Sequence, residues 1–392
     1  MSLRGKRLLT AMAFALVAVG VALAVYAPAL AFLMDLAGYR GSIRTLLPVK
    51  PATFTTSDRT VTTRWGPIAT RVYTPDGRHT RTAVVFPGVH GGGVDEPRLA
   101  LFCGRLASTG LTVVCTPLPE LREFRITSRS TDAIEDVTNW VISQALLAPS
   151  RRVALVGVSF SGGLALVAAG RDSLRHHLDV VLSVGGYGDL PRALRYLCTG
   201  QLPDGTVRTP HDYGLAVIAL AAVPRLVPAA QVNVLEGGIR TFLEASLDDT
   251  PTGERAGPLL AAARGAALGM PEPARSILTD ILDRNVVRVG AMLLPLLDEL
   301  GQDAALSPDR SPVTDAPVFL IHGRDDNVIP SSETPLVAAD YARRGNTRVR
   351  WLLTPLLSHA NLGGAAAVGD AWRLLSFWHQ VLGVMDARAS NQ

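Results

Sequence analysis

The 392-residue chain is nearly without lysine, which occurs only at positions 6 and 50. Arginine therefore carries almost all of the positive charge, and it is scattered among acidic residues without forming a basic stripe. The formal net charge is only +4. Because a nucleic-acid-binding surface needs clustered basic residues, the composition gives no support for a nucleic-acid partner.

Cysteine is also scarce. Cys103, Cys115 and Cys198 show no spacing typical of a metal site. A disulfide between Cys103 and Cys115 is one interpretation, and isolated buried thiols are the favoured one. A glycine-rich stretch at residues 87–93 lacks the lysine of a P-loop and the G-x-G-x-x-G spacing of a dinucleotide site. We therefore expect no metal, nucleotide or other cofactor.

Charged residues are absent from residues 8–34, and this apolar stretch follows Arg4, Lys6 and Arg7. It exceeds the roughly 20 residues that a helix needs to cross a bilayer. We therefore expect residues 1–37 to be a signal anchor, one transmembrane helix that attaches the protein to the membrane. The predicted location of the catalytic part is extracytoplasmic, in the periplasm or at the cell surface. A cleaved signal peptide, which would make the protein secreted, is the alternative.

Beyond a linker at residues 38–60, short apolar runs alternate with helical patterns. Strands are expected at residues 61–65, 68–73, 83–86, 111–115, 153–156, 180–184, 318–321 and 349–353. This alternation predicts an α/β fold with a mainly parallel sheet covered on both faces, and an antiparallel pair at one edge. Leucine- and alanine-rich helical stretches replace the strands over residues 186–312. We expect them to form a helical cap insertion that divides the core into residues 61–185 and 313–392.

The stretch from Gly157 to Gly163 reads Gly-Val-Ser-Phe-Ser-Gly-Gly and lies between a predicted strand and a predicted helix. A serine on such a turn, with tiny residues two positions away on either side, is typical of the nucleophile elbow of serine hydrolases. The apolar run ends at residue 156, so Ser159 falls at the apex of the turn and is the predicted nucleophile. Ser161 stands where the motif usually has its last glycine, and it remains the alternative nucleophile.

A glycine loop, the serine elbow, an acidic motif and a histidine follow one another along the chain. The acidic motif, residues 322–330, reads His-Gly-Arg-Asp-Asp-Asn-Val-Ile-Pro. With the strand pattern, these motifs resemble the α/β-hydrolase superfamily, in its serine esterase and lipase-like branches, over residues 61–382. The resemblance implies that Asp326 is the catalytic acid, with Asp325 as the alternative, and that His359 is the base.

The resemblance also implies an oxyanion hole built from backbone N–H groups. One donor is expected at Phe160, directly after the nucleophile. The other is expected in the glycine loop, where Val89 and Gly91 are both candidates.

These motifs predict a serine hydrolase that cleaves a carboxylic ester through a Ser-His-Asp triad and an acyl-enzyme. The apolar composition of the cap favours a small-molecule or lipid-like ester with a hydrophobic acyl or alcohol part. An acyltransferase on the same triad is one alternative. A non-catalytic binding protein with the α/β-hydrolase fold is the other.

Overall fold

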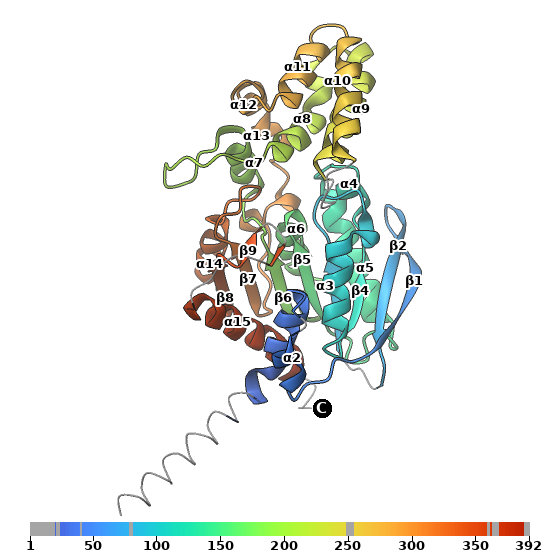
Figure 1. The fold of residues 1–392 in the computed structure, drawn as a ribbon, viewed down its shortest axis with the longest axis vertical. Helices are drawn as coiled ribbons and strands as arrows, with labels where there is room; N and C mark the ends of the chain where they lie inside the picture. Colours follow the sequence, from blue (N-terminus) through green and yellow to red (C-terminus); the bar gives the residue numbers. More distant parts are fainter. Residues whose placement is uncertain are drawn as a thin grey trace, which may run out of the picture.

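The computed structural model describes residues 20, 24–39, 41–77, 81–247, 255–358, 361–362 and 368–387. Its centre is an eight-stranded sheet with the strand order β1-β2-β4-β3-β5-β6-β7-β8 (Figure 1). β2 pairs antiparallel with β1 and β4, and the other neighbouring strands of this sheet pair in parallel. The strands are β1 (Phe54–Thr63), β2 (Gly66–Pro75), β3 (Thr82–Phe86), β4 (Thr112–Cys115), β5 (Val153–Val158), β6 (Leu178–Val184), β7 (Val318–Gly323) and β8 (Val349–Thr354). The predicted α/β fold with a mainly parallel sheet is confirmed.

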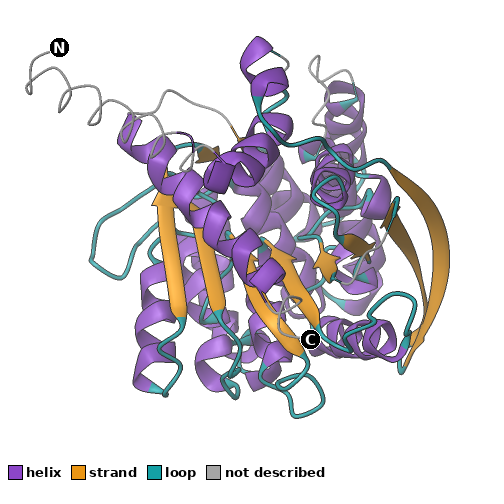
Figure 2. Ribbon diagram, turned by 90° about the horizontal axis from the view of Figure 1, so that it is seen from below, coloured by secondary structure: helices purple, strands orange, loops and turns teal. Residues whose placement is uncertain are grey.

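Helices cover both faces of the sheet, as Figure 2 shows. One face packs against α3 (Pro97–Ala107), α15 (Val368–Ala387) and a helix at residues 24–36. The other face packs against α5 (Ser128–Ser143), α6 (Phe160–Ala169) and α14 (Glu333–Arg343). All five residues of β3 are buried, which explains why this strand is a continuous apolar run apart from its first residue.

Between β6 and β7 the described residues form seven α-helices that lie beyond one end of the sheet (Figure 1). We call them the cap. They are α7 (Leu190–Thr199), α8 (Asp212–Leu226), α9 (Val232–Ser246), α10 (Ala256–Leu268), α11 (Ala274–Leu282), α12 (Val286–Leu293) and α13 (Leu297–Leu300). Leu235, Ile239, Phe242 and Leu278 are buried among these helices, so the cap has an apolar interior of its own. Short 3-10 helices accompany the cap between β6 and β7: η2 (Ala229–Gln231), η3 (Leu294–Leu296), η4 (Ala304–Leu306) and η5 (Pro308–Arg310). The short helices before β6 are α2 (Ser42–Leu46), η1 (Gly93–Asp95) and α4 (Pro119–Arg122).

The predicted membrane anchor is corrected by the structure. Across the described ranges, no helix is both long enough and apolar enough to cross a membrane. Residues 24–36 of the predicted anchor segment pack on the sheet layer instead, with Phe32 only 2 % exposed. The Phe32 ring lies 4.7 Å from the ring of Trp378 on α15 and 6.4 Å from that of Phe102 on α3, centroid to centroid.

Residues 1–19 and 21–23 of the predicted anchor segment lie outside the described residues. The apolar stretch is long enough for a bilayer, but one face of its described part is buried against protein. The membrane-anchored, extracytoplasmic location predicted from that anchor is therefore wrong.

Cys103 on α3 and Cys115 on β4 are both buried and both free. The favoured interpretation of buried thiols without a disulfide is confirmed, but the two side chains are neighbours and not isolated. Burial, with a smaller contribution from the neighbouring Cys115, raises the pKa of the Cys103 thiol well above its usual value. Protonated, buried thiols of this kind act as small apolar side chains.

Candidate active site

Ser159 sits between the last residue of β5 and the first residue of α6. Its backbone angles are φ 57° and ψ −129°, a conformation that a residue with a side chain rarely adopts. The Ser159 N–H donates to the carbonyl oxygen of Val184 on β6 at 2.7 Å, and its own carbonyl accepts from the Gly162 N–H at 2.8 Å. The turn is thus held from both sides in a strained conformation, the geometry of a nucleophile elbow.

The small residues around Ser159 are required by close packing. A Cβ added to Gly157 would lie 2.2 Å from the carbonyl oxygen of Ser161. A Cβ added to Gly162 would lie 2.6 Å from the Ser183 hydroxyl, and one on Gly163 would lie 2.8 Å from the Tyr187 ring. Contacts this short exclude any side chain, so the glycines allow α6 to start directly against β5 and β6.

Ser161, the alternative nucleophile, is fully buried and is hydrogen-bonded to the backbone. Its hydroxyl lies 2.6 Å from the carbonyl oxygen of Phe86, to which it donates, and it accepts from the Val158 N–H at 2.8 Å. Ser161 therefore joins the ends of β3 and β5. It is absent from the lining of the cavity that Ser159 faces.

Asp326, the predicted acid, lies in the loop after β7 and is 2 % exposed. Its Oδ1 accepts from the N–H groups of Val328 and Ile329 at 2.8 and 3.1 Å, so the side chain is fixed within its own loop. Asp325, the alternative, is exposed. Both aspartates line the same cavity as Ser159.

A buried histidine, His322, supports this loop from the end of β7. Its Nδ1 lies 2.9 Å from the Thr334 hydroxyl and its Nε2 lies 2.9 Å from the carbonyl oxygen of Ile329. Nε2 is also 3.4 Å from Oδ2 of Asp326. His322 thus has a partner for each ring nitrogen, Thr334 at the start of α14 and Ile329 in the acid loop, and so ties the loop to that helix.

His359, the predicted base, lies outside the described residues, as does Ala360. The described residues on either side are paired as short antiparallel strands, β9 (Leu357–Ser358) and β10 (Asn361–Leu362). Leu357 lines the cavity that also contains Ser159 and Asp326.

The glycine loop after β3 passes directly over the elbow. A Cβ added to Gly88 would lie 2.8 Å from Cβ of Ser159 and 3.2 Å from its Oγ, so the loop backbone touches the serine at this residue. The carbonyl oxygen of the next residue, Val89, accepts from the Tyr213 hydroxyl of the cap at 2.8 Å. Gly91 is oriented differently: its carbonyl accepts from Nε of Arg122 at 3.3 Å.

Ser159 is a strained serine at the carboxyl end of a central parallel strand, and Asp326 is an acid in the loop after β7. Within the eight-stranded sheet only β2 runs in the opposite direction. These three features together identify the fold. The chain has an α/β-hydrolase fold. No protein-family model matches the sequence, and no curated protein matches it either. Solved structures with a similar chain trace carry esterase names.

One of these is an esterase from Pyrobaculum calidifontis, 17 % identical, with a TM-score of 0.46 over 86 % of this chain and 87 % of that one. EstE1, a carboxylesterase cloned from a metagenomic library, is 16 % identical, with a TM-score of 0.47 over 86 % and 90 %. Carboxyl esterase 2 of the fungus Tuber melanosporum is 12 % identical, with a TM-score of 0.48 over 84 % and 86 %.

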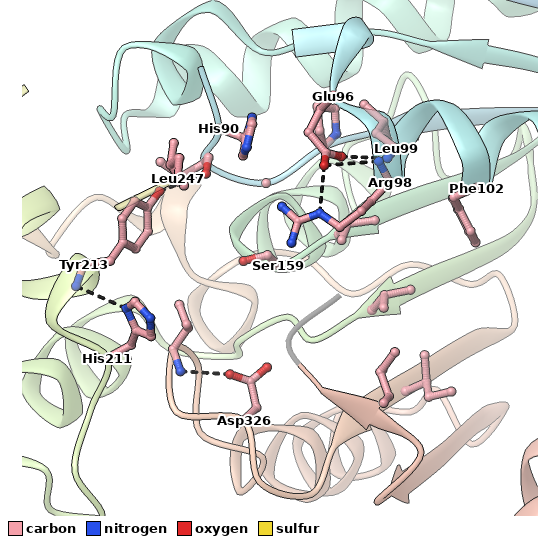
Figure 3. A pocket seen from close by; sticks show the side chains of 18 of the residues that line it. His90, Glu96, Arg98, Leu99, Phe102, Ser159, His211, Tyr213, Leu247 and Asp326 are labelled. Atoms are coloured by element: carbon pink, nitrogen blue, oxygen red, sulfur yellow. Dashed lines mark hydrogen bonds and ion pairs between the residues drawn. The ribbon is translucent and has the colours of Figure 1, made fainter. Parts of the chain in front are cut away.

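The α/β-hydrolase fold of this chain encloses a cavity of about 560 Å³ in front of Ser159 (Figure 3). The cap contributes His211, Tyr213 and Leu247 to one side of it. The opposite side, which we call the apolar arm, is formed by side chains from the N-terminal helix, α3, β9 and α15. The apolar arm consists of Leu36, Leu99, Phe102, Leu357 and Trp378.

A charged pair lies between these two sides. The Glu96 carboxylate accepts from the N–H groups of Arg98 and Leu99 at the start of α3, and from Nε of Arg98 at 2.7 Å. Burial alone would raise the pKa of Glu96, but these donors outweigh burial and lower it. Glu96 therefore stays ionised as a helix cap and holds the Arg98 side chain along the cavity wall (Figure 3).

Sequence reasoning missed the cavity residues that come from distant segments. Tyr213 and His211 fall within the predicted cap insertion, and Leu36 falls within the predicted anchor segment. A local signal exists for Glu96 alone: it precedes Pro97, a pattern typical of a helix start.

Proposed function

We propose that this chain is a serine hydrolase that cleaves carboxylic esters with a hydrophobic acyl or alcohol part. The observation that carries the proposal is the strained backbone of Ser159, which exposes its hydroxyl to the cavity that Asp326 also lines. Strain of this kind persists where the fold must present a side chain for chemistry. Ser159 is the nucleophile of the proposed reaction, and Ser161 is a structural residue of the elbow.

In the proposed reaction, His359 accepts the Ser159 hydroxyl proton while Oγ attacks the ester carbonyl carbon. Asp326 orients His359 and stabilises its protonated ring. The tetrahedral intermediate collapses when the bond to the alcohol oxygen breaks, and His359 returns the proton to that oxygen. Water, deprotonated by His359, then attacks the acyl-enzyme, which releases the carboxylic acid and restores Ser159.

The negative oxygen of the intermediate needs preorganised donors. The N–H of Phe160, the first residue of α6, is one of them. The N–H of Val89 is proposed as the other, because the neighbouring Gly88 is the residue at which the loop backbone touches Ser159. The side chains of the apolar arm support a hydrophobic substrate group, since they offer an apolar wall beside the reacting serine.

Labelling with a fluorophosphonate probe tests the nucleophile. We expect labelling of the wild type and of Ser161→Ala, and no labelling of Ser159→Ala. Tandem mass spectrometry of the labelled peptide identifies the modified serine. Labelling that survives Ser159→Ala and vanishes in a folded Ser161→Ala protein assigns the attack to Ser161. A folded wild type that takes up no label contradicts the proposed hydrolase activity.

A chain-length series of p-nitrophenyl esters tests the hydrophobic substrate. Each buried methylene contributes about 0.8 kcal/mol, so kcat/KM should rise by up to about fourfold per added CH₂ until the cavity is filled. Turnover of the acetate alone would contradict an apolar acyl site. Hydrolysis of short and long esters at equal rates would contradict it as well.

A further inference from the structure

A short segment that leads into α8, residues 208–213, contacts both the acid loop and the glycine loop. The Arg208 guanidinium donates to the carbonyl oxygens of Arg324 and Asp326 at 3.1 and 3.4 Å. The His211 N–H donates to the carbonyl oxygen of Asn327 at 2.8 Å. One end of the segment is therefore fixed to the acid loop.

The other end of the segment reaches across the cavity to the glycine loop. The Tyr213 hydroxyl donates to the carbonyl oxygen of Val89 at 2.8 Å, and Tyr213 is 7 % exposed. Its N–H lies 3.3 Å from Nδ1 of His211, so the start of α8 is capped by the ring beside it. Burial raises the pKa of Tyr213, which favours the protonated hydroxyl that donates this hydrogen bond.

The hydrogen bond to Val89 matters because this part of the chain is rich in glycine. Gly88 precedes Val89, and Gly91, Gly92 and Gly93 follow shortly after. Glycine backbones have more accessible conformations than other residues, so such a loop needs external contacts to hold one of them. The Tyr213 hydroxyl supplies such a contact on the very residue proposed to donate its N–H to the oxyanion.

We infer that Tyr213 is a positioning residue of the oxyanion hole. The Tyr213 hydroxyl holds the Val89 carbonyl, and with it the peptide plane that follows Val89, toward the cap. This contact restrains the adjacent peptide between Gly88 and Val89, whose N–H is the proposed oxyanion donor. This inference rests on the proposed hydrolase function. It assigns to the cap a part in stabilising the transition state, in addition to its part in enclosing the substrate.

Tyr213→Phe removes the hydroxyl and keeps the ring that packs beside His211. Loss of a direct oxyanion donor costs about a hundredfold to a thousandfold in kcat. Because Tyr213 acts through Val89, we expect a smaller fall, of about tenfold to a hundredfold in kcat, with KM for p-nitrophenyl butyrate changed by less than about twofold. The affinity of a trifluoromethyl ketone, which forms a tetrahedral adduct with the serine, should fall in parallel with kcat.

Tyr341→Phe is the matched control. Tyr341 on α14 is fully buried, and its hydroxyl lies 3.5 Å from the carbonyl oxygen of Leu166, away from the cavity lining. We expect unchanged kcat for this variant. Rates of both variants are divided by the concentration of folded protein, measured by circular dichroism at the assay temperature, so that partial unfolding does not imitate a catalytic loss.

Four results would overturn the inference. Unchanged kcat in Tyr213→Phe, beside an active wild type, removes the positioning role and leaves the proposed function intact. A rise in KM with constant kcat assigns the hydroxyl to substrate binding. An equal loss in Tyr341→Phe makes the effect a general one of buried hydroxyls. An inactive, unlabelled wild type overturns the proposed function together with this inference.

Discussion

At the scale of single residues, the two serines of the elbow differ in what surrounds them. Ser159 faces the cavity, whereas the hydroxyl of Ser161 bonds the carbonyl of Phe86 and the N–H of Val158. A glycine, usual at this place of the motif, would leave both backbone groups without that partner. Ser161 therefore lacks the backbone freedom of a glycine, and its hydroxyl links the ends of β3 and β5.

Ser161→Ala should lower the stability of the protein and leave its chemistry in place. The alanine strands a buried N–H and a buried carbonyl, which costs about 1–3 kcal/mol. We expect this decrease in the free energy of unfolding from urea denaturation with an unchanged m-value. Wild-type stability for the variant would show that water or a backbone shift satisfies the two groups.

Gly88→Ala should abolish most of the activity without unfolding the protein. The new methyl would lie 2.8 Å from Cβ of Ser159 and must displace either the serine or the loop. Because small displacements in an active site are costly, kcat/KM for p-nitrophenyl butyrate should fall by about a hundredfold or more.

Gly91→Ala is the control, since a Cβ at Gly91 meets no atom within 4 Å. Its kcat/KM should stay within about twofold of the wild type. A strong loss of kcat/KM in Gly91→Ala, with little effect of Gly88→Ala, would indicate that the oxyanion donor lies in the later part of the loop and not at Val89.

At the scale of elements, the predictable part of the fold is the part encoded by neighbouring residues. The buried central strands are continuous apolar runs, so the sequence predicts them, and Ser159 and Asp326 follow strands in short motifs. β1 starts at Phe54, earlier than the predicted residue 61. The apolar pattern does not report its first half, because that half is polar and lies at the exposed edge of the sheet. Edge strands need not alternate between apolar and polar residues.

The rest of the site could not be predicted, because it depends on contacts between distant segments. Tyr213 is far from Val89 in sequence, and no local pattern reports that its hydroxyl reaches that carbonyl. The helix at residues 24–36 illustrates the same problem. An apolar helix buried against protein and one buried in lipid have similar compositions, and only the partner side chains, such as Trp378, distinguish them.

This helix also contributes Leu36 to the apolar arm, so a substitution there tests whether the arm holds the acyl chain. Leu36→Trp should fill part of the arm and shift the ester preference toward short chains. The ratio of kcat/KM for p-nitrophenyl octanoate to that for the butyrate should fall by about tenfold, since one misfitting group in an apolar pocket costs at least that much.

Val25→Trp is the control on the same helix, because Val25 is an exposed residue outside the cavity lining. We expect its octanoate-to-butyrate ratio to match the wild type. Equal ratios in all three proteins would mean that the acyl chain does not enter the arm near Leu36.

At the scale of the whole molecule, a buried ion pair joins the first cap helix to the sheet layer. Glu333 of α14 is fully buried and accepts from the Arg192 guanidinium of α7 and from the Gly188 N–H. Asp309 accepts a further bond from Arg192 at 3.2 Å. The ion pair thus holds α7, the first helix of the cap, close to the end of β6.

Arg192→Met should destabilise the protein strongly, because it leaves the Glu333 carboxylate buried without its counter-charge. Removal of one partner of a buried pair costs about 3–5 kcal/mol, and partial exposure of Arg192 places the expectation near 3 kcal/mol. The measurement is the free energy of urea unfolding. The double variant Arg192→Met/Glu333→Gln should recover part of the lost free energy of unfolding. A double variant less stable than Arg192→Met would contradict this account.

The contact between Phe32 and Trp378 also determines when, during synthesis of the chain, this part of the cavity wall can form. The two residues lie near opposite ends of the sequence, so Phe32 leaves the ribosome long before its partner exists. The wall of the cavity that their helices build can therefore close only after nearly all of the protein has been synthesised. Until then, the face of the helix at residues 24–36 that α15 covers stays exposed on the nascent chain, and exposed apolar surface of this kind promotes aggregation during synthesis.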